Sequence, residues 1–140
     1  MEKLVDAGFV KSIGISNYNK RQTERILSCC RIKPVMNQIE IHVHFTNEKL
    51  VKFLKSVDIG ITAYAPFGSP ASSFAQGRSG PLDEPWVKEI AERHHKTTGQ
   101  VLIRHCIQRG IVCIPKSVTP SRIRENFQVI YYILKRLVTN

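Results

Sequence analysis

The feature that most constrains the fold of this chain is a repeated succession of three parts. A short apolar, β-branched run is followed by a polar turn and then by a segment with helical spacing of apolar residues, about four times in 140 residues. The predicted strands are 12–15, 34–41, 61–64 and 111–114. Apolar strands that alternate with helices are typical of a parallel sheet covered by helices. We therefore expect an α/β fold of about four βα units with parallel strands.

Helix-start signals follow the predicted strands. Asn19, with Gln22 three residues later, has the pattern of a capping box. After the second strand, Thr46 is expected to cap a helix that ends at Gly60. The single apolar face of that helix consists of Leu50, Phe53, Leu54 and Val57.

A long loop and three further helices complete the expected pattern. The loop spans residues 66–81, and loops longer than ~12–15 residues in a compact domain are commonly lids or binding loops. Helices are expected near 86–94 and from a cap at Thr98 to a stop at Gly110. The last helix starts where Thr119 places a capping hydroxyl before Pro120.

Composition narrows the class of protein. The chain is 42% hydrophobic and 23% charged, as ordinary globular domains are. The longest uncharged stretch, 59–77, contains three glycines and two prolines, which a membrane span of ~20 apolar residues would not. Since no apolar leader follows Met1, we expect a cytoplasmic protein with no membrane partner. The four cysteines show neither C-x-x-C spacing nor a matching histidine pair, so we expect free thiols and no metal site.

The net charge of +10 suggests an anionic partner. Seven basic residues but one acidic residue lie between Val101 and Asn140, which fits either nucleic acid or a phosphate-bearing cofactor. The strongest local signal is 116–120 followed by Arg122. A helix N-terminus offers free backbone N–H groups there, and Lys116 and Arg122 add positive charge for a phosphate. The alternative is a solvated basic helix start.

Polar residues end each apolar strand. In parallel α/β sheets, ligands bind at the carboxyl ends of the strands, so these residues form one candidate rim. The alternative is ordinary turn chemistry. The rim consists of Ser16, Asn17, Asn37, Gln38, Glu40, Tyr64, Lys116 and Ser117.

Other reactive side chains give weaker signals. His42 and His44 alternate beyond the second strand, and we expect no carboxylate or cysteine close by to complete a metal site with them. His105 falls on an apolar helix face typical of a core. No lysine close in sequence would lower the pKa of the Tyr64 phenol, so packing or stacking suits it better than proton donation. Ser69 lacks the G-x-S-x-G setting of a serine hydrolase.

Four segments at these strand ends resemble the aldo-keto reductase family. They are GISNYN at 14–19, VMNQIE at 35–40, TAYAPFGS at 62–69 and IPKSVTPSRIRENF at 114–127. The resemblance covers residues 1–129, taken as a partial domain, and leaves a divergent tail at 130–140. It implies the C-terminal half, strands five to eight, of a (β/α)8 TIM barrel that reduces aldehydes and ketones with NADPH. The family's catalytic Asp, Tyr, Lys and His belong to the first half, so we expect no catalytic residue here.

The resemblance also implies cofactor residues, position by position. Ser16, Asn17 and Gln38 match residues that hydrogen-bond the nicotinamide carboxamide, and Tyr64 matches the aromatic that stacks on its ring. The loop beneath the pyrophosphate is matched by Ala65, Phe67 and Ser69. The contacts to the 2′-phosphate are matched by Lys116, Ser117, Val118, Thr119 and Arg122, and those to adenine by Glu125 and Asn126. The implied partners are NADP(H) and a small carbonyl substrate, which explains the basic C-terminal third without nucleic acid.

Three segments depart from the family pattern. Ala71 stands where many members carry an acidic residue that fastens the loop over the cofactor. The run HVHF at 42–45 replaces a common C-H-P-Y-type run, and YYILKRLVTN replaces the family's final segments. We therefore expect a truncated product without catalytic activity of its own. The alternative is a non-catalytic nucleotide-binding or interaction module.

Half a barrel would leave strand edges near Ile13 and Val112 without a neighbouring strand. The inward faces of the strands would also be uncovered. We therefore expect the chain either to self-associate through these edges or to stay partly unfolded and aggregate. The apolar side chains expected on those faces are Ile13, Ile15, Val35, Ile39, Ile61, Ala63, Val112 and Ile114.

Overall fold

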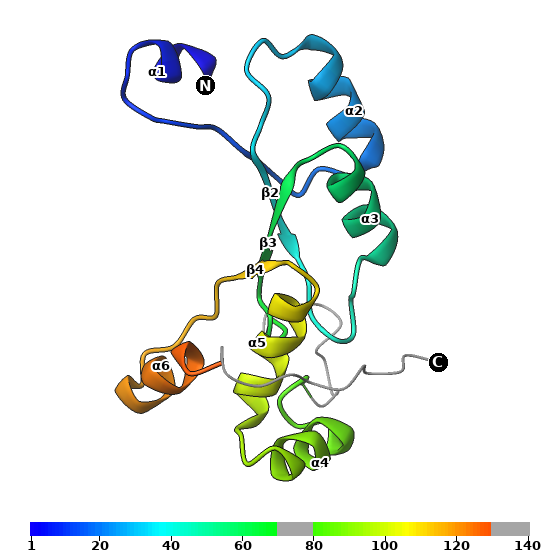
Figure 1. Cartoon of the computed structure of the whole chain (residues 1–140), viewed down its shortest axis with the longest axis vertical. Coiled ribbons are helices and arrows are strands. Elements are labelled where there is room, and N and C mark those ends of the chain that lie inside the picture. The colour runs from blue at the N-terminus through cyan, green and yellow to red at the C-terminus, as the bar shows by residue number, and fades with distance from the viewer. Residues whose placement is uncertain (70–79, 130–140) are drawn as a thin grey trace. The chain divides into compact units, whose positions relative to one another are not determined.

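The computed structural model describes residues 1–69 and 80–129, in which helices and strands alternate along the chain (Figure 1). The elements are α1 (Glu2–Asp6), β1 (Ile15–Ser16), α2 (Lys20–Cys29), β2 (Met36–Glu40), α3 (Glu48–Ser56), β3 (Gly60–Tyr64), α4 (Pro85–Arg93), α5 (Thr98–Gln108), β4 (Val112–Cys113) and α6 (Pro120–Phe127). Two compact units are present: Met1–Glu40 with Asn47–Thr62, and Ile41–Thr46 with Ala63–Asn140. We describe each unit by itself.

The four strands form one parallel sheet in the order β1-β2-β3-β4. Ile15 lies opposite Asn37 and Ser16 opposite Gln38 in the parallel β1–β2 pair. β1 and β4 are shorter than the expected runs, but backbone hydrogen bonds continue past their ends. The Val35 N–H donates to the Ile13 carbonyl over 2.9 Å, and the Ile114 N–H donates to the Ala63 carbonyl over 3.1 Å. The expected α/β class with parallel strands is confirmed.

In the first unit, α2 begins with the expected capping box. The Asn19 side chain accepts from the Gln22 N–H and the Gln22 side chain accepts from the Asn19 N–H, each over 2.9 Å. These two bonds satisfy N–H groups that a helix start leaves without intrahelical partners. α2 packs beside α3, where the Lys20 ammonium lies 5.4 Å from the centre of the Phe53 ring.

The expected boundaries of α3 were wrong at both ends. Asn47, in the left-handed conformation with φ 51°, precedes the helix in place of Thr46. Its side-chain amide donates to the Glu40 carbonyl over 2.8 Å, which fixes the turn between β2 and α3. The helix ends at Ser56, and Gly60 opens β3. A Cβ at Gly60 would lie 2.9 Å from the Met36 Cε, so glycine provides room for that side chain.

α1 was not among the expected helices, and contacts distant in sequence hold it. The Glu2 carboxylate accepts from the backbone N–H groups of Arg31 and Ile32 over 2.7 and 2.8 Å. These hydrogen bonds lower the pKa of Glu2. Asp6 pairs with the Arg31 guanidinium over 2.6 Å. A five-residue helix is too short to be stable alone, so the spacing of its apolar residues was too short a pattern to predict a helix from sequence.

In the second unit, α4 packs on α5 around a buried cluster. Val87, Ala91, Val101 and Leu102 form the cluster, and Val43, Phe67 and Ile90 pack against it. α5 is capped by Thr97 and not by Thr98, the expected residue: the Thr97 hydroxyl accepts from the Gln100 N–H over 3.2 Å. Both threonines can cap, and Thr97 is the one with a glutamine three residues later.

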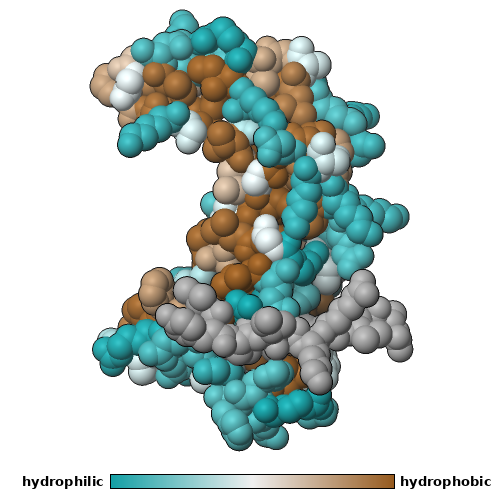
Figure 2. All heavy atoms as spheres, in the orientation of Figure 1, coloured by the Kyte–Doolittle hydropathy of each residue, from teal (hydrophilic) through white to brown (hydrophobic). Residues whose placement is uncertain are grey.

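The expectation that all the apolar strand residues are uncovered was wrong for the central strands. Ile39, Ile61 and Ala63 are buried. Ile39 shares the packed face of β2 with buried Asn37, opposite to exposed Gln38, because side chains alternate between the two faces of a strand. Val35, Val112 and Ile114 are 51%, 54% and 45% exposed. Ile13 and Ile15 are half-buried. Figure 2 shows hydrophobic residues at the surface between hydrophilic ones.

None of the described helices combines the length and the hydrophobicity that crossing a membrane requires. Within residues 1–69 and 80–129, three or more histidine, cysteine or carboxylate side chains do not cluster in a way that could hold a metal ion.

Candidate functional site

Three of the expected site residues meet in the first unit, where β1 leaves the sheet beside β2. The Asn17 N–H and the Ser16 hydroxyl both donate to the Gln38 carbonyl, over 2.9 and 3.0 Å. Asn17 has a φ of 59°, a left-handed conformation that asparagine tolerates better than most residues. All three side chains are exposed, so their polar atoms are available to a ligand.

Asn37 positions this group, although its place in the sequence predicts only a member of the polar rim. It is fully buried on the face of β2 opposite to Gln38, and its amide donates to the Tyr18 carbonyl over 2.9 Å. The contact holds the turn that follows Ser16 and Asn17. Its Oδ1 is buried with no hydrogen-bond partner among the described residues. An amide on the core face of a strand was the available signal for a positioning role.

In the second unit, a tight turn follows Tyr64. Tyr64 is half-buried at the end of β3, and the Gly68 N–H donates to the Ala65 carbonyl over 2.8 Å. Ala65 and Gly68 both have positive φ, 47° and 77°. A Cβ at Gly68 would lie 2.9 Å from Pro81 Cδ, so only glycine fits there without a shift. Ser69 is half-buried, and Ala71 lies outside the described residues.

The N-terminus of α6 carries the densest group of expected site residues. Thr119 precedes Pro120 as expected, but its side chain makes no cap hydrogen bond. The Ser117 hydroxyl instead accepts from the Thr119 N–H over 3.2 Å. The first turn of α6 contains no acidic residue. Lys116, Val118, Thr119 and Arg122 are exposed, with Val118 at 78%.

The end of α6 approaches the turn after β3 over the start of α5. A Cβ built on Gly99 would lie 3.5 Å from Phe67 Cζ and 3.6 Å from Asn126 Oδ1. Phe67 and Asn126 therefore both lie against Gly99, a residue that has no side chain. Because Phe67 also packs on the α4–α5 cluster, its bulk is accommodated by the core of this unit. Glu125 is half-buried, and its carbonyl accepts from Gln100 over 3.0 Å.

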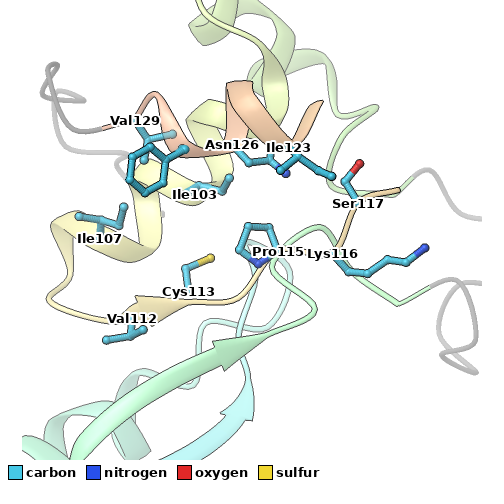
Figure 3. A pocket seen from close by; sticks show the side chains of 11 residues that line it. Ile103, Ile107, Val112, Cys113, Pro115, Lys116, Ser117, Ile123, Asn126 and Val129 are labelled. Carbon is cyan, nitrogen blue, oxygen red and sulfur yellow. The ribbon is translucent and has the colours of Figure 1, made fainter. Parts of the chain in front are cut away.

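A cavity of about 590 Å³ lies between α5, β4 and α6 (Figure 3). Lys116, Ser117 and Asn126 line one end of it, whereas Ile107, Val112 and Val129 line the other. The Lys116 side chain extends away from the cavity in this view. Most of the lining is apolar, so the cavity suits a neutral group. It lies beside Lys116 and Ser117, two of the candidate phosphate-binding residues.

The histidines fit the expectations in part. A carboxylate does lie near His44, contrary to expectation: Glu84, forty residues later, accepts from its Nε2 over 2.9 Å. The His42 and His44 rings are 6.0 Å apart, edge to face. His105 is half-buried, with its Nε2 atom buried. Burial, with the nearby Arg109 charge, lowers its pKa to about 4. It is therefore neutral at physiological pH.

A family model of the aldo/keto reductase family matches residues 1–136. The chain belongs to the aldo/keto reductase family. It is 50% identical over 130 residues to aldo-keto reductase family 1 member A1-A of Danio rerio, covering 92% of this chain and 40% of that protein. It is 44% identical over 140 residues to an NADH-dependent D-xylose reductase of Candida parapsilosis, covering 96% of this chain and 43% of the relative.

Solved structures of the family agree with the fold. The aldose reductase from Schistosoma japonicum matches with a TM-score of 0.86 and 53% identity, over 96% of this chain and 41% of that chain. An aldo-keto reductase in complex with NADPH matches with a TM-score of 0.86 and 35% identity, over 96% and 42%. The expected family and the (β/α)8 barrel relationship are thereby confirmed. The chain spans about two fifths of the length of the relatives it matches.

Proposed function

We propose that this chain is the NADP(H)-binding part of an aldo-keto reductase. The observation that carries the proposal is the group of donors at the start of α6. Lys116 and Arg122 are exposed cations, Ser117 adds a hydroxyl, and the first turn contains no carboxylate that would repel an anion. Backbone N–H groups of a helix start complete a donor set suited to a phosphate.

The residues of the first unit fit the other end of such a cofactor. A primary carboxamide needs an acceptor for its NH₂ group and a donor for its carbonyl. Ser16 uses its proton on the Gln38 carbonyl, so its oxygen is left to accept. The exposed side-chain amides of Asn17 and Gln38 supply both donors and acceptors. We therefore assign these three residues to the nicotinamide carboxamide and Tyr64 to the ring face.

The fit extends to the remaining residues of the second unit. The turn at Ala65, Phe67 and Ser69 is assigned to the pyrophosphate, and Glu125 and Asn126 to adenine. Val118 and Thr119 flank the phosphate donors. When bound, the cofactor supplies the hydride for reduction of a small carbonyl substrate. The residues of this chain bind and orient it.

Cofactor preference tests the proposal. The NADH-dependent xylose reductase among the relatives and the NADPH complex among the structures mean that family membership alone does not set the preference. Lys116 and Arg122 favour the 2′-phosphate that NAD⁺ lacks, so the chain should bind NADP⁺ more tightly than NAD⁺ in calorimetric titration. Lys116→Ala and Arg122→Ala should each weaken NADP⁺ binding about tenfold, as expected for a charge-assisted hydrogen bond.

Arg124→Ala is the matched control, because Arg124 is an exposed cation on the same helix outside the donor group. It should change NADP⁺ affinity less than twofold, and neither Lys116→Ala nor Arg122→Ala should alter NAD⁺ affinity. Equal affinity of the parent chain for the two cofactors would contradict the assignment. So would an equal loss for all three variants, which would indicate a general effect of net charge.

Catalysis is the second test, and here the expected result is negative. The family resemblance implies that the catalytic Asp, Tyr, Lys and His belong to a part of the barrel that this sequence does not match. The purified chain should therefore oxidise NADPH no faster with an aldehyde present than in buffer alone, followed by NADPH absorbance. Turnover by the chain would overturn this view. Absence of both turnover and NADP⁺ binding would instead favour an interaction module that uses no nucleotide.

A further inference from the structure

Two cysteines meet in the second unit, where α5 packs on β4. Cys106 is 1% exposed on α5, and Cys113 is half-buried in β4. The Ile111 N–H donates to the Cys106 carbonyl over 3.1 Å, which holds the connection between the two elements against the end of α5. Each thiol shifts the pKa of the other, which places the two side chains next to each other. The cofactor assignment uses neither of them.

The cavity gives a small reagent access to one of these sulfurs. Cys113 lines the cavity between α5, β4 and α6, and its side chain rises from β4 into it (Figure 3). Cys106 does not line it and is buried. A reagent that enters the cavity therefore reaches Cys113 first, with Cys106 as the neighbouring thiol.

The electrostatics of the pair favour loss of one proton. The hydrogen bond from Cys113 and the charge of Arg109 lower the pKa of Cys106, against the effect of burial. The hydrogen bond to Cys106, together with burial, raises the pKa of Cys113. The remaining proton therefore stays on Cys113, next to the Cys106 thiolate, and a thiolate is the form of cysteine that attacks electrophiles.

We propose that Cys106 and Cys113 form an oxidation site that hydrogen peroxide converts into an intrachain disulfide. Cys113, the thiol that the reagent reaches, passes its proton to the Cys106 thiolate, and its sulfur then attacks one peroxide oxygen and the O–O bond breaks. The departing hydroxide takes up a proton and leaves as water, and Cys113 becomes a sulfenic acid. The Cys106 sulfur then attacks the Cys113 sulfur and displaces a second hydroxide, which leaves as water. Two thiols lose two electrons and two protons, and peroxide is reduced to two waters.

The other two cysteines provide an internal comparison. Cys29 is exposed at the end of α2, where its thiol donates to the Ile26 carbonyl over 3.6 Å. Cys30 follows it directly in sequence, and both belong to the first unit. Neither thiol has a cysteine partner from another element, so peroxide should leave them as separate sulfenic or sulfinic acids and not as a disulfide.

Peptide mapping of the folded chain tests the proposal. The chain is treated with limiting hydrogen peroxide, blocked with an alkylating reagent and digested with trypsin without reductant. Cleavage after Arg104, Arg109 and Lys116 separates the two cysteines into peptides 105–109 and 110–116. The expected result is one species in which these peptides are joined, and dithiothreitol should release them. Recovery of the two peptides unjoined, with Cys113 over-oxidised and Cys106 still alkylated, would overturn the proposal.

Two variants and a denatured sample sharpen the result. Cys106→Ala removes the resolving thiol, so Cys113 should accumulate as a sulfenic acid that dimedone traps. Cys29→Ser with Cys30→Ser should still give the joined peptides. In urea, where the fold no longer selects a partner, disulfides to peptide 26–31 should appear as well. A disulfide pattern that is the same in buffer and in urea would show that the fold plays no part, and would also overturn the proposal.

Discussion

At the scale of single residues, His105 links pH to stability. Its folded pKa of about 4 lies below the ordinary value of 6.5, because burial and the Arg109 charge disfavour the protonated ring. Between about pH 6.5 and pH 4 the unfolded chain takes up a proton that the folded chain does not. The free energy of unfolding should therefore fall as pH is lowered through this window, by at most about 3 kcal/mol from this residue.

Chemical denaturation at several pH values measures this effect. His105→Phe should flatten the slope between pH 6.5 and pH 4, because it removes the titrating group. Nε2 of His105 has no hydrogen-bond partner among the described residues, so the polar atom is lost without breaking a bond. The control is His95→Asn at an exposed, left-handed position that asparagine tolerates, and it should keep the slope. An unchanged slope in His105→Phe would contradict the prediction.

The sequence was sufficient to select candidate site residues, but it did not show which contacts support them. The strand-end rule selects Ser16, Gln38 and Lys116, and the structure places Ser16 at the end of β1, Gln38 within β2 and Lys116 after β4. Asn37 is next to Gln38 in sequence but faces the core, and only the structure shows that it holds the Tyr18 carbonyl. Glu84 approaches His44 through tertiary packing, to which neighbouring sequence gives no signal.

At the scale of elements, two glutamines allow a matched comparison. Gln22 and Gln100 occupy the same position in the capping boxes of α2 and α5. Gln100 is 5% exposed, and its amide also donates to the Glu125 and Gln128 carbonyls over 3.0 and 3.2 Å. Gln100 therefore caps the start of α5 and also supplies a hydrogen-bond donor to the carbonyl groups at the end of α6. Gln22 is exposed, and its described side-chain bond is the local one.

Alanine at each position should separate the two roles. Gln100→Ala leaves two α6 carbonyls without their donor and should cost about 2–3 kcal/mol, whereas Gln22→Ala loses part of a local cap and should cost less than about 1 kcal/mol. Urea unfolding monitored by far-UV circular dichroism gives both values. Equal losses would show that Gln100 contributes only through the capping box.

The helix boundaries show where local signals are sufficient. The α2 cap was predicted because Asn19 and Gln22 bond each other and need no distant partner. The start of α3 was missed because Asn47 is fixed by the Glu40 carbonyl, and α1 because its stabilising contacts come from Arg31 and Ile32. Contacts distant in sequence leave no periodic pattern, so such boundaries become visible only in the folded chain.

At the scale of the whole molecule, the sheet has two edge strands among the described residues. β1 pairs with β2, and β4 pairs with β3, so each leaves one row of backbone N–H and C=O groups without a strand beside it. Val112 on β4 is 54% exposed, and Ile114 just beyond it is 45% exposed. Exposed strand edges with apolar side chains are sites at which a second chain can add.

We therefore predict that the chain self-associates at micromolar concentration, with a second copy pairing along an edge strand. Light scattering after size-exclusion chromatography should show a mass that rises with concentration.

Val112→Lys places a charge on the β4 edge and should shift the chain toward the monomer, because edge lysines oppose strand addition. Val118→Lys, at a 78% exposed position outside the strands, adds the same charge and should leave the mass unchanged. A monodisperse, folded monomer of the parent chain at all concentrations would contradict the prediction, and equal effects of the two lysines would indicate general charge repulsion in place of edge pairing.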